Sequence, residues 1–291
     1  MLGPMRLPFL ILTPACVAVG VGTAWWQTGN IHWGYVLLAL LGALGAHISV
    51  NSFNEYFDFK SGLDSKTIRT PFSGGSGTLQ AQPGLEKAAL ALSWISFTIT
   101  AAVGAYFVWQ QGWQILPVGL LGLALMVTYT NWWIRNPLLS LIAPGLGFGV
   151  LMVMGTHFAL TGTFTWASFF ASLVPTFLVS NLLLLNQFPD VEADQSIGRK
   201  HLPITIGRQA AARVYGAFLL MTYLSIIVGV ILKILPPLSL IALLTAILAL
   251  RVYRGVIQNP EDIPSLIPLM GMNVIINLVT PALLAVGLFL S

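Results

Sequence analysis

Four long stretches of the sequence contain no charged residue, and this feature restricts the possible fold more than any other. No Asp, Glu, Lys or Arg occurs at 7–54, 88–134, 136–189 or 263–291. Only 8% of the chain is charged, whereas soluble domains carry about 25%. A chain with so few charges cannot cover itself with a surface that water solvates well, so we expect it to lie in a lipid bilayer.

The lengths of these stretches predict the number of helices. A helix that crosses a bilayer needs about 20 apolar residues, so each of the first three stretches is long enough for two helices. Each also has a turn signal near its middle, at 27–30 (QTGN), 110–112 (QQG) and 161–163 (TGT). We therefore expect an all-α polytopic membrane bundle of nine transmembrane helices in a single membrane domain, 1–291. The expected ranges are 8–26, 33–54, 88–109, 113–134, 139–160, 166–188, 212–233, 238–255 and 265–289.

The positions of the charges support this count. With nine spans, the N-terminus and the loops after the second, fourth, sixth and eighth helices lie on one side. That side holds all nine acids and all 13 Lys and Arg residues except Lys233. The positive-inside rule makes this side cytoplasmic, which predicts a multi-pass protein of a plasma membrane or cell inner membrane with its active site on the cytoplasmic side. Because the basic residues sit at helix ends and form no face of their own, we expect no nucleic-acid partner.

Two polar segments on the cytoplasmic side, at about 55–87 and 189–211, begin with the same pattern. Asn54-x-x-x-Asp58 follows the second expected helix, and Asn186-x-x-x-Asp190 follows the sixth. Because four helices separate the copies, both halves of the chain enter the membrane in the same direction. This predicts a parallel four-helix internal repeat that places the two polar segments face to face.

Polar residues at helical spacing form a stripe at the end of each of these helices. The stripes consist of His47, Asn51, Asn54 and Asp58 in the first copy and of Asn186, Asp190 and Asp194 in the second. Polar side chains at membrane depth are costly in lipid, so the stripes should face the bundle interior. Pro189 either kinks the second stripe or restarts the helix. Glu55 and Glu192 lie off the stripes, which favours solvent-facing positions for both.

The chemistry of these side chains suits a metal-bound diphosphate. Mg²⁺ takes oxygen ligands and often bridges one or two carboxylates to substrate phosphates. The nearby Lys66, Arg69, Arg199 and Lys200 can neutralise the remaining phosphate charge. For each of these four residues, a topogenic charge at the lipid headgroups is an equally good interpretation. The sequence has neither a Cys/His cluster for a soft metal nor a P-loop for a nucleotide.

These residues and their spacing resemble the UbiA superfamily of intramembrane prenyltransferases. The resemblance rests on Asn54-x-x-x-Asp58-x-x-x-Gly62-x-Asp64 and Asn186-x-x-x-Asp190-x-x-x-Asp194, each at the end of a helix of a nine-helix bundle. The flanking sequences RTPFSGGSG at 69–77 and GRKHLPITIG at 198–207 agree with it, as does Tyr129. The acid at Asp64 and the sequence NQFPD in the second motif resemble the branch of 1,4-dihydroxy-2-naphthoate prenyltransferases of menaquinone synthesis.

The resemblance implies Mg²⁺-dependent transfer of an isoprenyl group from an allylic isoprenyl diphosphate to a small aromatic acceptor, a dihydroxynaphthoate-like quinone precursor, with release of pyrophosphate. The metal ligands that it implies are Asn54, Asp58, Asp64, Asn186, Asp190 and Asp194, with the four acids as the catalytic residues. Arg69 and Lys200, together with Lys66 and Arg199, would stabilise the departing pyrophosphate. His47, Asn51 and Tyr129 are the predicted acceptor-binding residues, although a packed core histidine is an equally good interpretation of His47.

Two other functions stay open at this point. One is a secondary transporter with a polar internal site, but transporters commonly place ionisable groups near the membrane midplane, and these acids lie at helix ends. The other is a prenyltransferase that uses a non-quinone acceptor, such as a haem, chlorophyllide or lipid-glycerol precursor.

Overall fold

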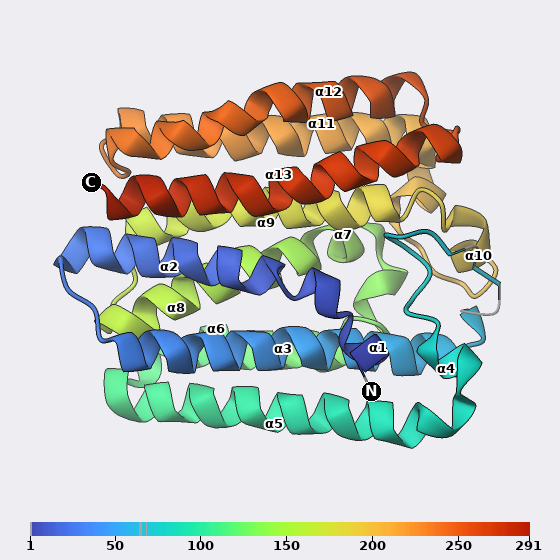
Figure 1. Cartoon of the computed structure of the whole chain (residues 1–291), viewed down its shortest axis with the longest axis horizontal. Helices are drawn as coiled ribbons and strands as arrows, with labels where there is room; N and C mark the ends of the chain where they lie inside the picture. Colours follow the sequence, from blue (N-terminus) through green and yellow to red (C-terminus); the bar gives the residue numbers. More distant parts are fainter. Residues whose placement is uncertain (1, 64–65, 68) are drawn as a thin grey trace.

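The structure, a computed structural model, describes residues 2–63, 66–67 and 69–291, and every regular element within them is helical. Most of the helices run along the long axis of the molecule (Figure 1). The long helices are α2 Leu12–Thr28, α3 Trp33–Lys60, α5 Glu86–Gln111, α6 Leu116–Thr128, α7 Pro137–Leu146, α8 Met152–Thr161, α9 Trp166–Asn186, α11 Leu202–Ile231, α12 Ala246–Gln258 and α13 Ile263–Phe289. The short ones are α1 Leu2–Met5, α4 Thr78–Ala81 and α10 Val191–Gln195. A π-helical segment, Gly147–Leu151, joins α7 to α8, and a 3₁₀ helix, Pro237–Thr245, precedes α12.

The helix ends follow the turn signals of the sequence. Gly29 after α2 and Gly162 after α8 adopt left-handed conformations, with φ of 64° and 71°. Glycine is the usual residue at such a helix end because it has no Cβ to clash. α5 likewise ends at Gln111, next to Gly112, so the turns predicted at 27–30, 110–112 and 161–163 are confirmed.

The predicted number of membrane spans is confirmed only in part. In the described part of the chain, seven helical segments are long and apolar enough to cross a membrane, and Gly3–Phe9 with α2, bent by 55°, makes an eighth. Nine spans are not confirmed, because the continuous helix in the expected span 113–134 ends at Thr128. At about 1.5 Å per residue, Trp113–Thr128 covers roughly 24 Å, which is less than a hydrocarbon core of about 30 Å. The chain is a multi-pass membrane protein, and the ninth span stays a prediction.

The charged connections gather at one end of the bundle. The N-terminal segment and the connections from α3 to α5, α9 to α11 and α12 to α13 all lie at the right in Figure 1. The turns at the opposite end carry Lys233 as their only charge. The two motif-bearing helices, α3 and α9, run in the same direction (Figure 1). The four-helix repeat itself stays a prediction.

Helix α9 forms the centre of the bundle. Two thirds of the residues in its apolar 18-residue stretch are buried, and the helix packs against α2, α7, α11 and α13. The π-helical segment approaches it closely, because a Cβ on Gly149 would lie 1.9 Å from Thr176 Oγ1. This packing fixes the end of α9, and therefore the start of the second motif, against its neighbours.

The two motifs have different backbones. α3 continues past its predicted end at 54 as far as Lys60, so Asn54 and Asp58 both lie on the helix. α9 instead ends at Asn186, and the chain turns before the short helix α10. Pro189 therefore restarts a helix, because its ring excludes a continuous one.

Candidate active site

One cavity of about 620 Å³ begins among the motif residues and extends along α3. On this helix its wall includes Asp58, Asn54, His47 and Ala39, all on the inner face. The rise of an α-helix makes the distance from Asp58 to Ala39 about 28 Å. Polar side chains gather at the Asp58 end, and small and aliphatic side chains of α3, α5 and α6 line the rest. The cavity thus has a charged head and a long apolar tail.

Most of the predicted site residues belong to the wall of this cavity. They are His47, Asn51, Asn54, Asp58, Tyr129, Asn186, Asp190, Asp194 and Arg199. The two motifs therefore meet, as the repeat predicted. Lys66, Arg69 and Lys200 have exposed side chains that are not part of the wall. Asp64 lies outside the described residues.

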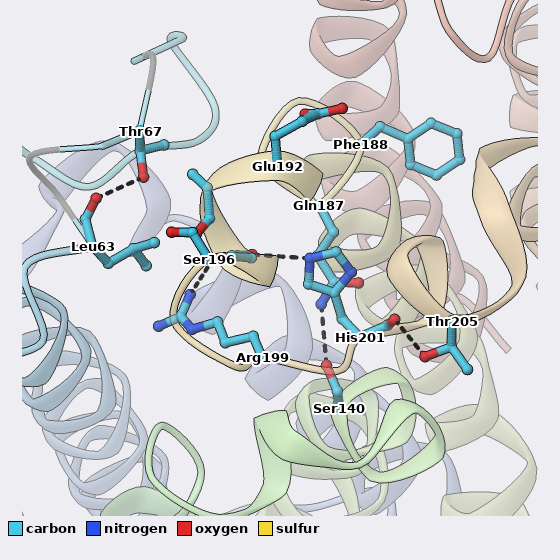
Figure 2. Close-up of polar contacts among 12 residues, drawn as sticks. Leu63, Thr67, Ser140, Gln187, Phe188, Glu192, Ser196, Arg199, His201 and Thr205 are labelled. Atoms are coloured by element: carbon cyan, nitrogen blue, oxygen red, sulfur yellow. Dashed lines mark hydrogen bonds and ion pairs between the residues drawn. The ribbon is translucent and has the colours of Figure 1, made fainter.

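Arg199 joins the two motifs. Its Nη1 donates to Asp194 Oδ1 at 2.9 Å, and its Nη2 donates to Asp58 Oδ1. Figure 2 shows Arg199 and His201 on the same loop, and His201 Nε2 lies 2.9 Å from the other carboxylate oxygen of Asp194. Burial alone would lower the pKa of Arg199, but the two carboxylates raise it above its ordinary value. A permanent cation therefore pairs with one acid from each motif.

Two further hydrogen bonds fix the polar segments that follow α3 and α9. Gln187 Nε2 donates to Ser140 Oγ at 3.1 Å, which attaches the end of α9 to α7 (Figure 2). Lys66 Nζ donates to Ser196 Oγ at 3.3 Å, which links the loop after α3 to the loop after α10. These contacts hold the two polar segments together at the head of the cavity.

Among the described residues, no cation forms an ion pair with Asp190. Its Oδ1 and Asn186 Oδ1 are both buried, and neither has a hydrogen-bond partner within the described residues. Burial, and then the neighbouring Asp194 carboxylate, raise the pKa of Asp190 to about 7. A buried polar oxygen without a partner is costly, so these two atoms mark a place where a ligand is needed.

The donor atoms at this place fit Mg²⁺. In the described parts of the chain, no three His, Cys, Asp or Glu side chains form a complete metal site. Mg²⁺ does not require one, because it usually keeps several waters and takes one or two carboxylates together with substrate phosphates. The unpaired oxygens of Asn186 and Asp190, with Asp58 and Asp194 on the same wall, supply hard oxygen donors of this kind.

The prediction that Glu55 faces solvent is wrong. Its side chain is fully buried and accepts hydrogen bonds from three donors: Arg6 Nε at 2.9 Å, Ser76 N at 2.6 Å and Ser76 Oγ at 3.0 Å. The helical wheel of α3 is correct, but the N-terminal segment (residues 3–9) and the glycine-rich loop (residues 70–77) cover the face that was expected to be open. Glu192, by contrast, is exposed and pairs with Arg208, as expected.

The predicted acceptor residues are wall residues with structural contacts as well. His47 Nδ1 lies 2.8 Å from Thr13 Oγ1, and its ring meets Phe148 edge to face. Asn51 Nδ2 donates to Met5 O at 3.1 Å. The Tyr129 hydroxyl is buried with no partner of normal geometry among the described residues. Their role in acceptor binding stays a prediction.

Sequence reasoning missed Arg6 and His201. Arg6 lines the cavity and donates to Asn54 Oδ1 at 3.1 Å, although it lies alone before a long apolar run, far in sequence from both motifs. His201 is fully buried against Asp194. Its place two residues after Arg199, in a loop that already carried a predicted site residue, was the available signal.

Comparisons with known proteins show which proteins the chain is similar to. Residues 13–272 match the model of the UbiA prenyltransferase family. The chain is similar to a 1,4-dihydroxy-2-naphthoate octaprenyltransferase of Bacillus subtilis (strain 168), at 29% identity over 270 residues that cover 88% of this chain and 81% of the relative. Its fold is similar to the apo structure of a UbiA homolog from Aeropyrum pernix K1, with a TM-score of 0.75, 18% identity and coverage of 96% and 98% of the two chains. It is also similar to a UbiA homolog from Archaeoglobus fulgidus bound to GPP and Mg²⁺, with a TM-score of 0.66, 15% identity and coverage of 97% and 98%.

Proposed function

Because the chain belongs to the UbiA prenyltransferase family and is therefore a membrane prenyltransferase, we propose that it transfers an isoprenyl group from an allylic isoprenyl diphosphate to a dihydroxynaphthoate. The proposed reaction depends on Mg²⁺ and releases pyrophosphate. One observation carries the proposal. Three acids from two distant motifs, Asp58, Asp190 and Asp194, line the head of a single cavity whose tail is apolar.

The shape of the cavity supports an isoprenyl diphosphate as the donor. This substrate has a highly charged head and a long hydrocarbon chain, and the cavity has the same polarity along its length. The tail of the cavity lies between α3, α5 and α6 and reaches Phe107 and Ile115 near the far end of the bundle. Burial of the isoprenyl chain there stabilises the complex by about 25 cal/mol for each Å² of apolar surface that is removed from water.

The polar residues would hold the diphosphate at the head. Asn186 and Asp190 present unpaired oxygens, and Asp58, Asp194 and Asn54 complete the donor set that would hold Mg²⁺. Mg²⁺ bound there would offset the charge of the diphosphate and make it a better leaving group. Lys66, Arg69 and Lys200, which lie at the same end, stay proposed as further diphosphate contacts.

Prenyl transfer follows from this arrangement with all atoms accounted for. The allylic C–O bond breaks, and its electron pair leaves with the pyrophosphate. An electron-rich ring carbon of the acceptor supplies the pair for the new C–C bond. That carbon then releases the group it carried, as H⁺ from a C–H carbon or as CO₂ from a carbon that bears a carboxylate, and the bonding pair stays in the ring and restores its aromaticity. Aromatic side chains of the wall, such as Phe148, can stabilise the allylic cation through their ring faces. The surrounding helices exclude water, which would otherwise capture the cation.

The choice of acceptor follows from the similar Bacillus protein, whose name gives a dihydroxynaphthoate. Under the positive-inside rule the charged end of the bundle faces the cytoplasm, so acceptor and pyrophosphate would exchange with that compartment.

Product formation by the purified protein tests this proposal. The protein in lipid nanodiscs is incubated with Mg²⁺, a labelled allylic diphosphate and 1,4-dihydroxy-2-naphthoate, and prenylated product and pyrophosphate are quantified. We expect both products, and we expect EDTA or Asp190→Asn to reduce them at least 100-fold. Glu192→Gln is the matched control, because this acid of the same segment is exposed and lies outside the cavity. Equal activity of Asp190→Asn and Glu192→Gln would refute the assigned site, and product only with a non-aromatic acceptor would refute the assigned substrate.

A further inference from the structure

We propose that Arg6 binds an anionic group of the acceptor, so that the enzyme selects an aromatic acid over the corresponding neutral phenol. The acid would bind where the main cavity meets a second one, between the N-terminal segment and the glycine-rich loop. This inference rests on the prenyl transfer proposed above, and it assigns a specificity-determining residue from a segment that neither motif contains.

The N-terminal segment holds Arg6 in a costly backbone conformation. Arg6 has a φ of 51° and a ψ of 53°, and it is one of two non-glycine residues with positive φ in the described part of the chain. A left-handed conformation costs a residue with a Cβ about 1–2 kcal/mol. Contacts with α3 maintain it: Asn51 Nδ2 donates to Met5 O at 3.1 Å, and Ser52 Oγ donates to Pro4 O at 3.4 Å. Strained residues that their surroundings hold in place cluster at functional sites.

Hydrogen bonds orient the guanidinium of Arg6 but leave some of its N–H donors without an acceptor among the described residues. Its Nε donates to Glu55 Oε1 at 2.9 Å, and its Nη2 donates to Asn54 Oδ1 at 3.1 Å. A guanidinium has five N–H donors, and within the described residues the remaining ones have no hydrogen-bond partner. A quarter of the side chain is exposed, while Glu55 beneath it is fully buried. The edge formed by Nη1 and Nη2 is therefore free to bind a carboxylate with two parallel hydrogen bonds.

A second cavity also has Arg6 in its wall. It has a volume of about 390 Å³ and lies between residues 3–9 and 70–76. Arg6, Phe9 and Phe72 belong to the walls of both cavities. The two phenylalanines provide apolar surface for a flat ring at the junction, and Arg6 provides the cation beside it. An aromatic acid matches both features, whereas a neutral phenol matches only the first.

Arg6 adjoins the acid cluster without pairing with any of its three acids. Arg199 is already shared by Asp58 and Asp194 at the head of the main cavity. Arg6 instead contacts Asn54 and Glu55, which lie one helical turn before Asp58 on α3. An anion bound to Arg6 would therefore lie next to the diphosphate site without occupying it, which is the relation that two reacting substrates require.

Equilibrium binding without turnover tests the inference. The fluorescence of two ring analogues, 1-hydroxy-2-naphthoate and 1-naphthol, is titrated with protein in nanodiscs of uncharged lipid. We expect the wild-type protein to prefer the acid. We expect Arg6→Gln to weaken binding of the acid by 10-fold or more, about 1.4 kcal/mol, and to change binding of 1-naphthol by less than 2-fold. Arg6→Lys should retain part of the preference, because it keeps the charge but loses the paired donors.

A matched control separates recognition from loosening of the N-terminal segment. Ser52→Ala removes one tie between this segment and α3 and touches neither cavity, so it should leave the preference for the acid unchanged. Equal weakening of both analogues by Arg6→Gln would overturn the inference, as would a wild-type protein without preference. It would also be overturned if Arg6→Gln weakened the binding of a non-reactive thiolo analogue of the prenyl diphosphate but did not weaken the binding of the naphthoate. Failure of the prenyl transfer itself would appear separately, as absence of product with every donor and acceptor.

Discussion

Glu55 offers the sharpest test of how the head of the cavity is built. It is a fully buried carboxylate that joins three segments: Arg6 of the N-terminal segment, α3 itself and Ser76 of the glycine-rich loop. Replacement of Glu55 by Gln keeps the shape and removes the charge. Oε1 can still accept a hydrogen bond, but the new amide NH₂ replaces the acceptor that faces Ser76 Oγ, and Arg6 loses its counter-charge.

The structure sets the size of the effect. Hydrogen bonds to charged groups contribute about 1.5–3 kcal/mol each, so we expect Glu55→Gln to cost about 2–4 kcal/mol of folding free energy. Glu55→Ala should cost about 3–5 kcal/mol, because it leaves the Arg6 cation half-buried and unpaired. For a chain of this size, 1 kcal/mol corresponds to roughly 2–4 °C in Tm, so the Gln variant should melt about 4–16 °C lower.

Thermal denaturation of the purified protein in nanodiscs, followed by intrinsic tryptophan fluorescence, measures this loss. Glu192→Gln is the control, because Glu192 is exposed and its pair with Arg208 should contribute no more than about 1 kcal/mol. The reasoning fails if the two Gln variants melt within about 1 °C of each other. In that case the N-terminal segment and the loop would not depend on the buried carboxylate.

Three further outcomes follow from the structure. In EDTA, Asp190→Asn should raise the Tm at pH 8 and not at pH 4. Because the pKa of Asp190 is raised to about 7 in the folded state, the wild-type protein loses stability as the pH rises from about 4 to 7. The neutral Asn side chain removes this loss, which is on the order of 2–4 kcal/mol. A pH-independent difference between the two proteins would contradict this. His201→Phe removes the bond to Asp194 Oδ2, so the Mg²⁺ concentration for half-maximal activity should rise about 10-fold or more, with unchanged acceptor KM; an unchanged Mg²⁺ requirement would exclude a positioning role. Gly149→Ala should lower the folding free energy by about 1–3 kcal/mol, because the new Cβ would overlap Thr176, whereas Gly104→Ala, which meets no atom within 4 Å, should not destabilise the protein; equal melting temperatures would show that α9 adjusts freely.

The sequence predicted the elements that depend on local pattern. Apolar length, turn residues and charge position are local signals, and they gave the helical membrane bundle and the three turns. The meeting of Asp58 with Asp190 and Asp194 was also predictable, because both motifs end helices that run in the same direction. Each of these inferences uses one helix at a time, together with the side of the membrane on which it ends.

The sequence did not indicate contacts that depend on a bend or on chain far away. Arg6 reaches Glu55 because the N-terminal helical turns meet α2 at 55°, and nothing in the apolar run marks that angle. Glu55 was assigned to solvent because a helical wheel shows the faces of one helix and not what covers them. The end of the fourth expected helix was placed too late for a related reason: the uncharged stretch continues through 129–134, whereas the continuous helix ends at Thr128.

The charges at the head of the cavity explain why metal and diphosphate should bind together. Arg6 and Glu55 form a neutral pair, and Arg199 offsets one of the two carboxylates that it contacts. The described residues therefore leave one negative charge on the wall, and a second one when Asp190 loses its proton. A diphosphate alone would be repelled by this wall. A divalent cation alone would neutralise the wall, but it would find few free ligand atoms, because Arg199 occupies Asp58 and Asp194. When the two arrive together, the phosphates supply the missing ligands of the metal and the metal supplies the missing charge of the wall, so each makes the other's binding favourable.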